Sequence, residues 1–243
     1  MADSNRLQAE QNTTTIDRIS NLPDSILCHI LSFVPTLTAV TTSLLSRRWR
    51  HLWKYLQVFS FHDPSETPQD FDVTYDDDPF GTLDGFVGFV NTVLALRRSP
   101  DIREFRLSCG YWFAVTISTA DCVNKWIRDA VGPHLQELHF SIDDSPNADI
   151  FTLLPLSVFT CSGLVTLSLM GAICVEKLST LLDLPKFGFL LHLSVTVPHV
   201  NLEFMVNLLK NFDMLQVLRI QKRVFGEKAG HNQSVNPTVL DRT

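Results

Sequence analysis

Residues Leu135 to Phe140 read LQELHF and residues Leu164 to Leu169 read LVTLSL, so both hexapeptides are apolar at positions one, four and six. Side chains alternate between the two faces of a β-strand, so positions four and six share one face. One such hexapeptide is typical of any amphipathic strand, whereas several in order indicate a repeat. The spacing recurs six times, at Leu56/Phe59/Phe61, Ile102/Phe105/Leu107, Leu135/Leu138/Phe140, Leu164/Leu167/Leu169, Leu190/Leu193/Val195 and Leu215/Leu218/Ile220.

Successive hexapeptides lie 46, 33, 29, 26 and 25 residues apart, and the last intervals match the 20–29 residues of a leucine-rich repeat. Stretches with helical apolar spacing separate them, for example around Phe86, Val123 and Met205. A strand that returns through a helix to a parallel neighbour is the unit of a solenoid. The sequence therefore predicts an α/β fold, with an irregular leucine-rich-repeat solenoid and a parallel sheet over residues 83–225.

The residues between the apolar positions are expected on the opposite, concave face of this sheet. They mix both charges with hydroxyl and imidazole groups, as a surface that binds a protein or a small ligand would. These candidate target-binding residues are Glu104, Arg106, Glu137, His139, Thr166, Ser168, His192, Ser194, Arg219 and Gln221.

The charge of the chain is uneven. The formal net charge is −6 over 243 residues, which argues against a general polyanion binder. Residues 61–79 hold seven acids, from Asp63 to Asp78, and no Lys or Arg, so a solvated acidic linker with the first repeat strand is predicted over 57–82. The polar residues 1–15 are predicted to be disordered, and the polar residues 226–243 are predicted to form a tail that does not pack on the fold. We expect the sheet edge near Ile220 to be left uncapped by that tail.

Residues 16–56 have the pattern of a small helical module. Apolar residues from Leu22 to Val34 recur at helical spacing, Pro23 suits the start of a helix, and Pro35 ends the segment. Thr36 or Thr38 can cap a second short helix. We expect this module to pack on the repeats, because Leu56 ends its last helix and opens the first hexapeptide.

The stretch Ser43 to Leu56 concentrates four basic residues and two tryptophans. On an α-helical wheel, Leu45, Trp49 and Trp53 fall in one arc with Leu52 and Leu56, while the basic residues occupy another. A platform for nucleic acid would interleave aromatic and basic side chains on one surface. The pattern therefore favours an apolar stripe for protein contact and a solvated basic arc, with nucleic-acid and membrane-surface binding as the alternatives.

The residues of this module resemble an F-box, and more closely the F-box of plant F-box/leucine-rich-repeat (F-box/FBD/LRR-like) proteins. The match is carried by Leu22-Pro23-Asp24-Ser25-Ile26-Leu27, Ile30-Leu31-Ser32, Pro35 and the run from Ser43 to Trp53. The resemblance implies a three-helix F-box at 16–56 whose apolar residues bind the Skp adaptor of a cullin ubiquitin ligase. By position, the implied contact residues are Leu22, Pro23, Ile26, Leu27, Ile30, Leu31, Leu44, Leu45, Trp49 and Trp53.

The function implied by the resemblance is that of a non-catalytic substrate adaptor. Its expected partners are a Skp protein, a cullin through it, and an unidentified target, with no nucleic acid and no membrane. Plant relatives often continue with more repeats and a further domain, so the chain is expected to be short at its C-terminus. The alternatives are a leucine-rich-repeat interaction module without a ligase, a plain helical module without an adaptor, and a nucleic-acid-binding regulator using residues 47–54.

Catalytic and metal chemistry find little support in the sequence. GxSxG, P-loop, GxGxxG and HExxH motifs are absent, and the eight His and five Cys lack metal-ligand spacing. Asp76, Asp78 and Gly81 fit a calcium loop, but Phe80 and Val87 stand where ligands are needed. We therefore expect no cofactor and no metal. The five cysteines form no CxxC pair, and neither a signal peptide nor a long apolar run is visible, so a reducing cytoplasmic or nuclear location is expected.

Overall fold

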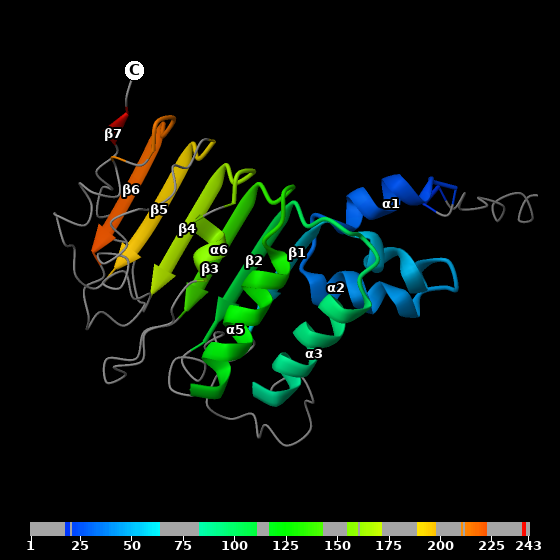
Figure 1. The fold of residues 1–243 in the computed structure, drawn as a ribbon. Coiled ribbons are helices and arrows are strands. Elements are labelled where there is room, and N and C mark those ends of the chain that lie inside the picture. The colour runs from blue at the N-terminus through cyan, green and yellow to red at the C-terminus, as the bar shows by residue number, and fades with distance from the viewer. Residues whose placement is uncertain are drawn as a thin grey trace, which may run out of the picture.

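The computed structural model describes residues 18–19, 21–63, 83–110, 117–142, 155–159, 161–171, 189–197, 210, 212–222 and 240–241. In these residues a parallel sheet carries helices on one face and a helical module beside its first strand (Figure 1). The predicted disorder of residues 1–15, the linker residues 64–82 and most of the predicted tail lie outside the described residues.

The sheet has its strands in chain order, and each neighbour from β1 to β6 is parallel. The parallel pairing expected between the LQELHF and LVTLSL segments is confirmed. The strands are β1 (Val58–His62), β2 (Glu104–Cys109), β3 (Glu137–Ile142), β4 (Thr166–Gly171), β5 (His192–Val197), β6 (Val217–Lys222) and β7 (Leu240–Asp241).

The register of the sheet follows the hexapeptides. Phe59, Phe105, Leu138, Leu167 and Leu193, each the fourth residue of its hexapeptide, are cross-strand partners in one row. None of them is more than 2% exposed. Burial of such a row removes a large apolar area from water at about 25 cal/mol per Å². The sequence spacing therefore gave both the strands and their alignment.

A repeated backbone contact keeps the starts of the strands in line. The carbonyl of Arg103, just before β2, accepts N–H groups of Gln136 and Glu137 at 2.8 and 3.1 Å. The carbonyl of Gln136, just before β3, accepts those of Val165 and Thr166 at 2.8 and 2.9 Å. The same double contact precedes the other strands from β2 to β6, so each strand begins level with its neighbour.

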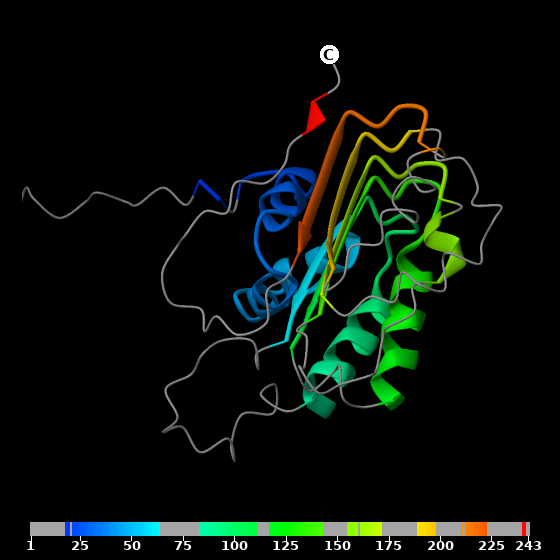
Figure 2. The ribbon, with the colours of Figure 1, turned by 90° about the vertical axis from the view of Figure 1, so that its left-hand side faces the viewer.

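Helices form a second layer on one face of the sheet, as the turned view in Figure 2 shows. Trp126 is fully buried in this layer, and its indole N–H donates to Asn91 Oδ1 at 2.9 Å. Phe86 meets the Trp126 ring edge-on at 6.1 Å between centroids. The helices of this layer are α3 (Leu83–Leu96), α5 (Ile117–Ala130) and the short α6 (Leu156–Phe159).

Gly163 allows the turn before β4 to pack on the turn before β3. A Cβ atom at this position would lie 2.5 Å from the carbonyl oxygen of Pro133 and 3.2 Å from that of Leu135. Both obstacles are backbone atoms, which cannot move aside as a flexible side chain could. Glycine is therefore required by the close approach of two chain segments.

The helical module contains two α-helices and two 3₁₀ helices, rather than the three helices expected. The chain turns between Leu45 and Arg48, so Leu45 leaves the predicted stripe and is 71% exposed, while Leu52 and Trp53 are buried. The α-helical wheel failed there because it assumed one continuous helix from Ser43 to Leu56. The elements are α1 (Asp24–Leu31), α2 (Thr36–Thr41), η1 (Thr42–Leu44) and η2 (Trp49–Tyr55).

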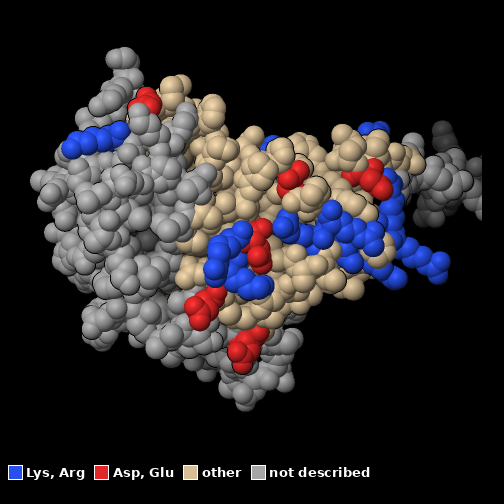
Figure 3. Space-filling model, viewed as in Figure 1, with Lys and Arg blue, Asp and Glu red and all other residues tan. Residues whose placement is uncertain are grey.

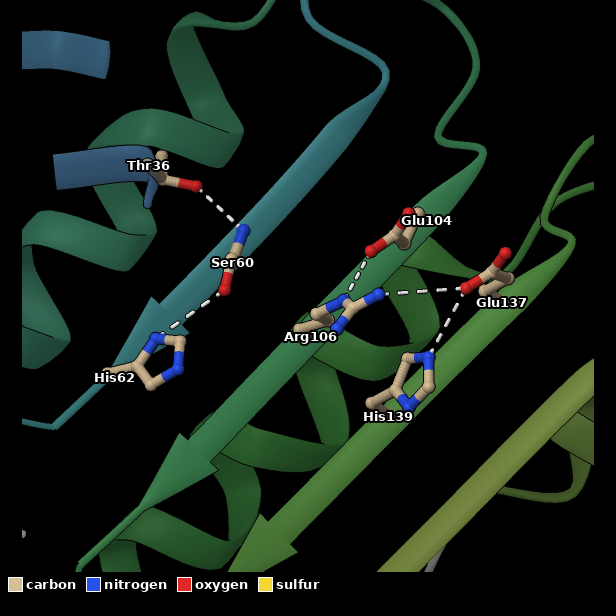
Figure 4. Close-up of polar contacts among 7 residues, drawn as sticks. All are labelled: Thr36, Ser60, His62, Glu104, Arg106, Glu137 and His139. Carbon is tan, nitrogen blue, oxygen red and sulfur yellow. Dashed lines mark hydrogen bonds and ion pairs between the residues drawn. The ribbon is translucent and has the colours of Figure 1, made fainter. Parts of the chain in front are cut away.

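The module packs against the outer edge of β1, as expected. Thr36 is 1% exposed, and its hydroxyl oxygen accepts the backbone N–H of Ser60 at 2.8 Å (Figure 4). The expectation that Thr36 or Thr38 caps this helix is wrong, because the helix begins at Thr36 itself, and Pro35 is at the N-cap position without a capping side-chain hydrogen bond. Leu27, Leu31 and Trp53 of the module join the same buried cluster as the sheet.

The structure corrects two predictions, one for the acidic linker after β1 and one for the polar tail beyond β6. Asp63, predicted in the solvated linker, is 4% exposed, and its carboxylate accepts the Gly110 N–H at 3.1 Å beyond β2. The tail also contributes strand β7, whose Leu240 and Asp241 pair antiparallel with Leu218 and Val217 of β6. Two paired residues therefore occupy part of the edge that was expected to be uncapped. Among the described helices none is long and apolar enough to cross a bilayer.

Candidate interaction surfaces

The helical module exposes large apolar side chains on the side away from the core. In α1, Leu27 and Leu31 are buried, while Ile26 and Ile30 are 44% and 43% exposed. A helix on the surface of a protein buries one apolar face and usually shows polar residues on the other. The apolar residues on the outer face of α1 are therefore available to a partner. We call Ile26, Ile30, Phe33, Leu37, Leu44 and Leu45 the apolar surface; all six are more than 40% exposed.

The predicted adaptor-binding residues divide into three groups by exposure. Pro23, Ile26, Ile30, Leu44 and Leu45 are exposed, and Leu22 and Trp49 are half-buried against the core. The third group is buried: Leu27, Leu31 and Trp53 are 0%, 3% and 6% exposed. These side chains pack inside the chain itself.

Sequence reasoning missed Phe33 and Leu37. Phe33 is 76% exposed and meets the His29 ring edge-on, with 4.9 Å between centroids. Together with Ile26 and Ile30 these residues follow the spacing i, i+4, i+7 and i+11 in the sequence, although Phe33 lies in the turn after α1 and Leu37 on α2. This spacing is visible in the sequence, but the predicted helix ends at Pro35, so the spacing was not followed as far as Leu37.

Arg48 ties the start of η2 to the start of α1. Its guanidinium contacts Asp24 Oδ1 through Nε at 2.8 Å and Nη2 at 2.7 Å, and Nη2 also donates to the Leu22 carbonyl. Arg48 is nevertheless exposed, so this contact adds an ion pair to the predicted basic arc and does not remove Arg48 from the surface. The contact lies beside the turn that precedes Trp49 and links this turn to α1.

Other basic residues of the module remain on the outer surface. Figure 3 shows Lys and Arg side chains in a band that runs from the module towards the neighbouring helices. Arg98 Nη1 donates to the Tyr55 hydroxyl at 3.1 Å, which joins the loop after α3 to η2. Within the described residues, no ion pair involves Arg47, Arg50 or Lys54. Lys54 instead lies over the Trp53 ring, 5.4 Å from its centroid.

The sheet face opposite α3 and α5 is polar. The registers place all ten predicted target-binding residues on this face, in rows that cross the strands. One row holds Glu104, Glu137, Thr166 and His192, and the next holds Arg106, His139, Ser168, Ser194 and Arg219, with Gln221 in the third.

Charged residues of β2 and β3 form one network on this face (Figure 4). Arg106 Nε donates to Glu104, and Arg106 Nη2 lies 3.8 Å from Glu137 Oε2. His139 Nε2 lies 3.4 Å from the same Glu137 oxygen. His62, at the end of β1, lies 3.5 Å from the Ser60 hydroxyl through Nδ1. The two carboxylates therefore hold the guanidinium and one imidazole in place.

A depression of about 230 Å³ lies beside this network. We call it the polar hollow and define it by its outward side chains; the backbone of Leu107 and Phe140 also lines it. These side chains are His62, Arg106, Ser108, His139, Ser141, Ser168 and Met170. Three of the predicted face residues, Arg106, His139 and Ser168, thus meet at one site, whereas His192, Ser194, Arg219 and Gln221 lie outside it.

The thiols of the described cysteines take part in packing. Burial, more than the nearby charge of Asp24, raises the pKa of the Cys28 thiol, and burial raises that of Cys161. Cys28 Sγ donates to the Leu52 carbonyl at 3.5 Å, and Cys161 Sγ to the Gly132 carbonyl at 3.4 Å. Both groups therefore act as protonated donors. In the part of the chain that the structure describes, no three His, Cys, Asp or Glu residues converge as metal ligands.

Comparison with known proteins identifies the helical module. Residues 19–61 match the family model of the F-box domain. Across 171 residues, 70% of this chain, the sequence is 35% identical to an FBD-associated F-box protein of Arabidopsis thaliana, of which the match covers 36%. An F-box/LRR-repeat protein from the same plant is 34% identical over 66% of this chain and 25% of its own length. An F-box protein is 34% identical over 70% of this chain and 46% of its own.

The matches reach well beyond the F-box domain, because 43 residues cannot account for alignments of 165 to 171 residues. They therefore include part of the repeat region. The chain spans about a quarter to a half of the length of the curated relatives it matches.

Proposed function

Since this chain carries an F-box domain and is similar to plant F-box/LRR-repeat proteins beyond it, we propose that it is the substrate-recognition subunit of a Skp-cullin-F-box ubiquitin ligase. F-box domains generally bind the Skp1 adaptor within such ligases. The protein itself performs no catalysis in this role. It brings a target near the ubiquitin-transferring subunits, in the cytoplasm or the nucleus.

The observation that carries the proposal is the apolar surface of the F-box domain. Leu44 and Leu45 are 87% and 71% exposed on η1 and beside it, an unusual position for two adjacent leucines. Large exposed apolar patches on soluble proteins mark interaction sites. Ile26, Ile30, Leu44 and Leu45 would form the centre of the Skp contact, with Pro23 and Leu22 at its margin. Leu27, Leu31 and Trp53 support them from below.

The repeats form the other half of the proposed adaptor. We infer that the strands and their helices are an irregular leucine-rich-repeat solenoid that begins at the F-box edge. Its polar face offers charged and hydroxyl groups on level strands, with no helix of the described residues across it (Figure 2). This face would bind the target protein.

The test of Skp binding uses Leu44 and Leu45, because their exposure allows truncation without loss of core packing. Burial of a leucine side chain at an interface contributes about 1.5–3 kcal/mol. Changing Leu44→Ala and Leu45→Ala together should therefore weaken the binding of a purified plant Skp protein by at least tenfold. Isothermal titration calorimetry measures the affinity, and circular dichroism verifies the fold.

The matched control is Arg47→Glu, an exposed basic residue two positions further along the chain. Arg48 is unsuitable as a control, because reversing its charge would also break its contacts with Asp24 and Leu22. If Arg47→Glu abolishes binding and the leucine pair does not, the basic band is the interface. Failure of the unaltered protein to bind any Skp protein would favour the alternative, an interaction module without a ligase.

A nucleic-acid-binding role for residues 47–54 is the remaining alternative, and the basic band in Figure 3 is the feature that would support it. Binding through several basic residues must weaken steeply as salt rises, because each phosphate contact releases counterions. Fluorescence anisotropy measures the affinity for labelled DNA and RNA at salt concentrations of about 50 to about 200 mM. A steep loss of affinity over this range would support the nucleic-acid role.

A further inference from the structure

Four cations lie close together where the F-box domain joins the repeat helices. The carbonyl of Lys54, near the end of η2, accepts the backbone N–H groups of Arg98 and Ser99 at 2.7 and 3.1 Å. Arg97 Nη2 donates to the Asp129 carbonyl at 3.2 Å, which joins the same loop to the last turn of α5. The basic band in Figure 3 runs over this region, from the module to the neighbouring helices. We define the junction patch as Lys54, Arg97, Arg98 and Arg128.

Arg97 has a structural role within the patch. Its Nη1 donates to the Ser99 and Pro100 carbonyls at 3.3 and 3.4 Å, in addition to the contact of Nη2 with α5. The Ser99 hydroxyl donates to the Asp101 carbonyl at 2.9 Å. These contacts fix the shape of the loop after α3, so its neighbour Arg98 is held in place before any partner binds.

The side chains of Arg98 and Lys54 lie against aromatic rings instead. Arg98 Nη1 donates to the Tyr55 hydroxyl at 3.1 Å, and the guanidinium carbon lies 6.0 Å from the centroid of the Tyr55 ring. Lys54 Nζ lies over the Trp53 ring. Aromatic rings orient such cations but leave their charge in place. Arg98 is exposed and Lys54 is half-buried, so both charges are accessible to a partner.

The positive charge of the patch is not balanced by nearby acids. Within the part of the chain that the structure describes, no ion pair involves a residue of the patch. The carboxylate of Asp129 pairs with Lys125 at 3.4 Å, and that of Asp101 lies 3.8 Å from His134. Like charges held close together repel one another, so an anionic partner lowers the free energy of this surface.

From this arrangement we propose that the junction patch binds an acidic segment of another polypeptide, chiefly through Arg98 and Lys54. Both groups form charge-assisted hydrogen bonds with carboxylates. An extended segment places successive carboxylates beside cations of η2, of the loop after α3 and of α5. The patch shares no residue with the apolar surface or with the polar hollow, and the proposal does not depend on the ligase role.

A nucleic acid fits the patch less well than a polypeptide does. Single strands stack successive bases on several aromatic rings. Of the two rings beside these cations, Tyr55 is 49% exposed, whereas Trp53 is buried beneath Lys54. The net charge of the chain is −6, so a long phosphate backbone would also be repelled beyond the patch. A short acidic segment can keep its charges on the patch.

The experiment measures the binding of short labelled peptides to the full-length purified protein by fluorescence anisotropy. Glu alternates with Ser in the probe peptide, and Gln or Lys replaces Glu in two control peptides. We expect the Glu peptide to bind about tenfold more tightly than the Gln peptide. This difference should shrink as salt rises, because ions screen exposed charges.

Substitutions in the patch test whether it is the binding site. Arg98→Gln and Lys54→Gln should each weaken binding of the Glu peptide, and together they should weaken it by about tenfold. Arg98→Lys keeps the charge but not the guanidinium that contacts Tyr55, and it should retain most of the affinity. Arg18→Gln is the matched control, because it removes an exposed cation that lies ahead of α1. Thermal unfolding verifies that the variants fold.

Three results would overturn the proposal: equal affinity for the Glu and Gln peptides, a preference for the Lys peptide, or binding of the Glu peptide that survives the double substitution. Labelled single-stranded RNA or DNA that binds more tightly than the Glu peptide, and is weakened by the double substitution, would assign the patch to nucleic acid instead. The assay contains no Skp protein, so its failure is distinguishable from a failure of the proposed function.

Discussion

Single residues show where burial decides a role that sequence pattern leaves open. Ile26 and Leu27 are neighbours of equal hydrophobicity in the same helix, yet one is 44% exposed and the other fully buried. Both were predicted to contact the adaptor, because the family motif contains both. Which of the two faces inward depends on where η2 packs against α1, and that information is not local to the motif.

The cysteine thiols provide a prediction at this scale. Because burial raises the pKa of Cys28 and of Cys161, both should remain protonated at neutral pH and react slowly with iodoacetamide. Mass spectrometry should find little alkylation of either thiol at pH 7.5 in the folded protein, and rapid alkylation of both in urea. Equal rates in the folded and unfolded chain would contradict the packing described here.

The same pKa shifts determine a trend in stability. A thiol whose pKa is raised by folding holds its proton more tightly in the native state. Its contribution to the free energy of unfolding is therefore complete below the ordinary thiol pKa of about 8.5 and is lost as the pH rises above it. Urea denaturation between pH 7.5 and 10 should show a decrease that is smaller in a protein carrying Cys28→Ala and Cys161→Ala.

At the level of elements, the strands were predictable and the third helix of the F-box module was not. Six hexapeptides with one spacing predicted the strands, because Phe105, Leu138 and their equivalents must all be buried on the same face of the sheet. The segment after Ser43 was misread because apolar periodicity does not distinguish one α-helix from two 3₁₀ turns separated by a bend. Beside the bend, Arg48 contacts Asp24 of α1, 24 residues earlier in the chain, and apolar periodicity carries no information on such a distant contact.

The contact between α2 and β1 gives a prediction at the scale of elements. Thr36→Val keeps the shape of the side chain but removes the acceptor of the Ser60 N–H, which leaves a part-buried donor without its partner. The cost of such a loss is about 1–3 kcal/mol in the free energy of unfolding. Urea denaturation measures it, and Thr36→Ser, which keeps the oxygen, is the matched control. A valine variant as stable as the serine variant would show that this hydrogen bond does not hold the module to the sheet.

For the whole molecule, the two ends of the sheet differ in how they are closed. The β1 end is covered by a helical module with a shared apolar core, whereas in the part of the chain that the structure describes the β6 end is paired by two residues of β7. An edge with few partners opens easily. We therefore predict that amide hydrogens of Arg219 to Lys222 exchange at least tenfold faster than those of Leu138 to Ile142.

Hydrogen exchange read by NMR or mass spectrometry tests this difference between the ends. Equal protection of β3 and β6 would mean that the edge beyond Leu218 is covered in solution. Adding a bound target and repeating the measurement would then show whether the covering group is displaced.

The placement of the F-box domain at β1 also fixes the direction in which such a molecule can change in evolution. A strand added at the β1 edge would have to displace α2, so a duplicated repeat is accommodated more easily further along the sheet, towards β6. Each added strand would extend the polar face by about 4.8 Å. The polar hollow, on the first four strands, would keep its distance from the F-box unchanged. A family built in this way could vary the far end of the polar face while the position next to the F-box domain stays constant.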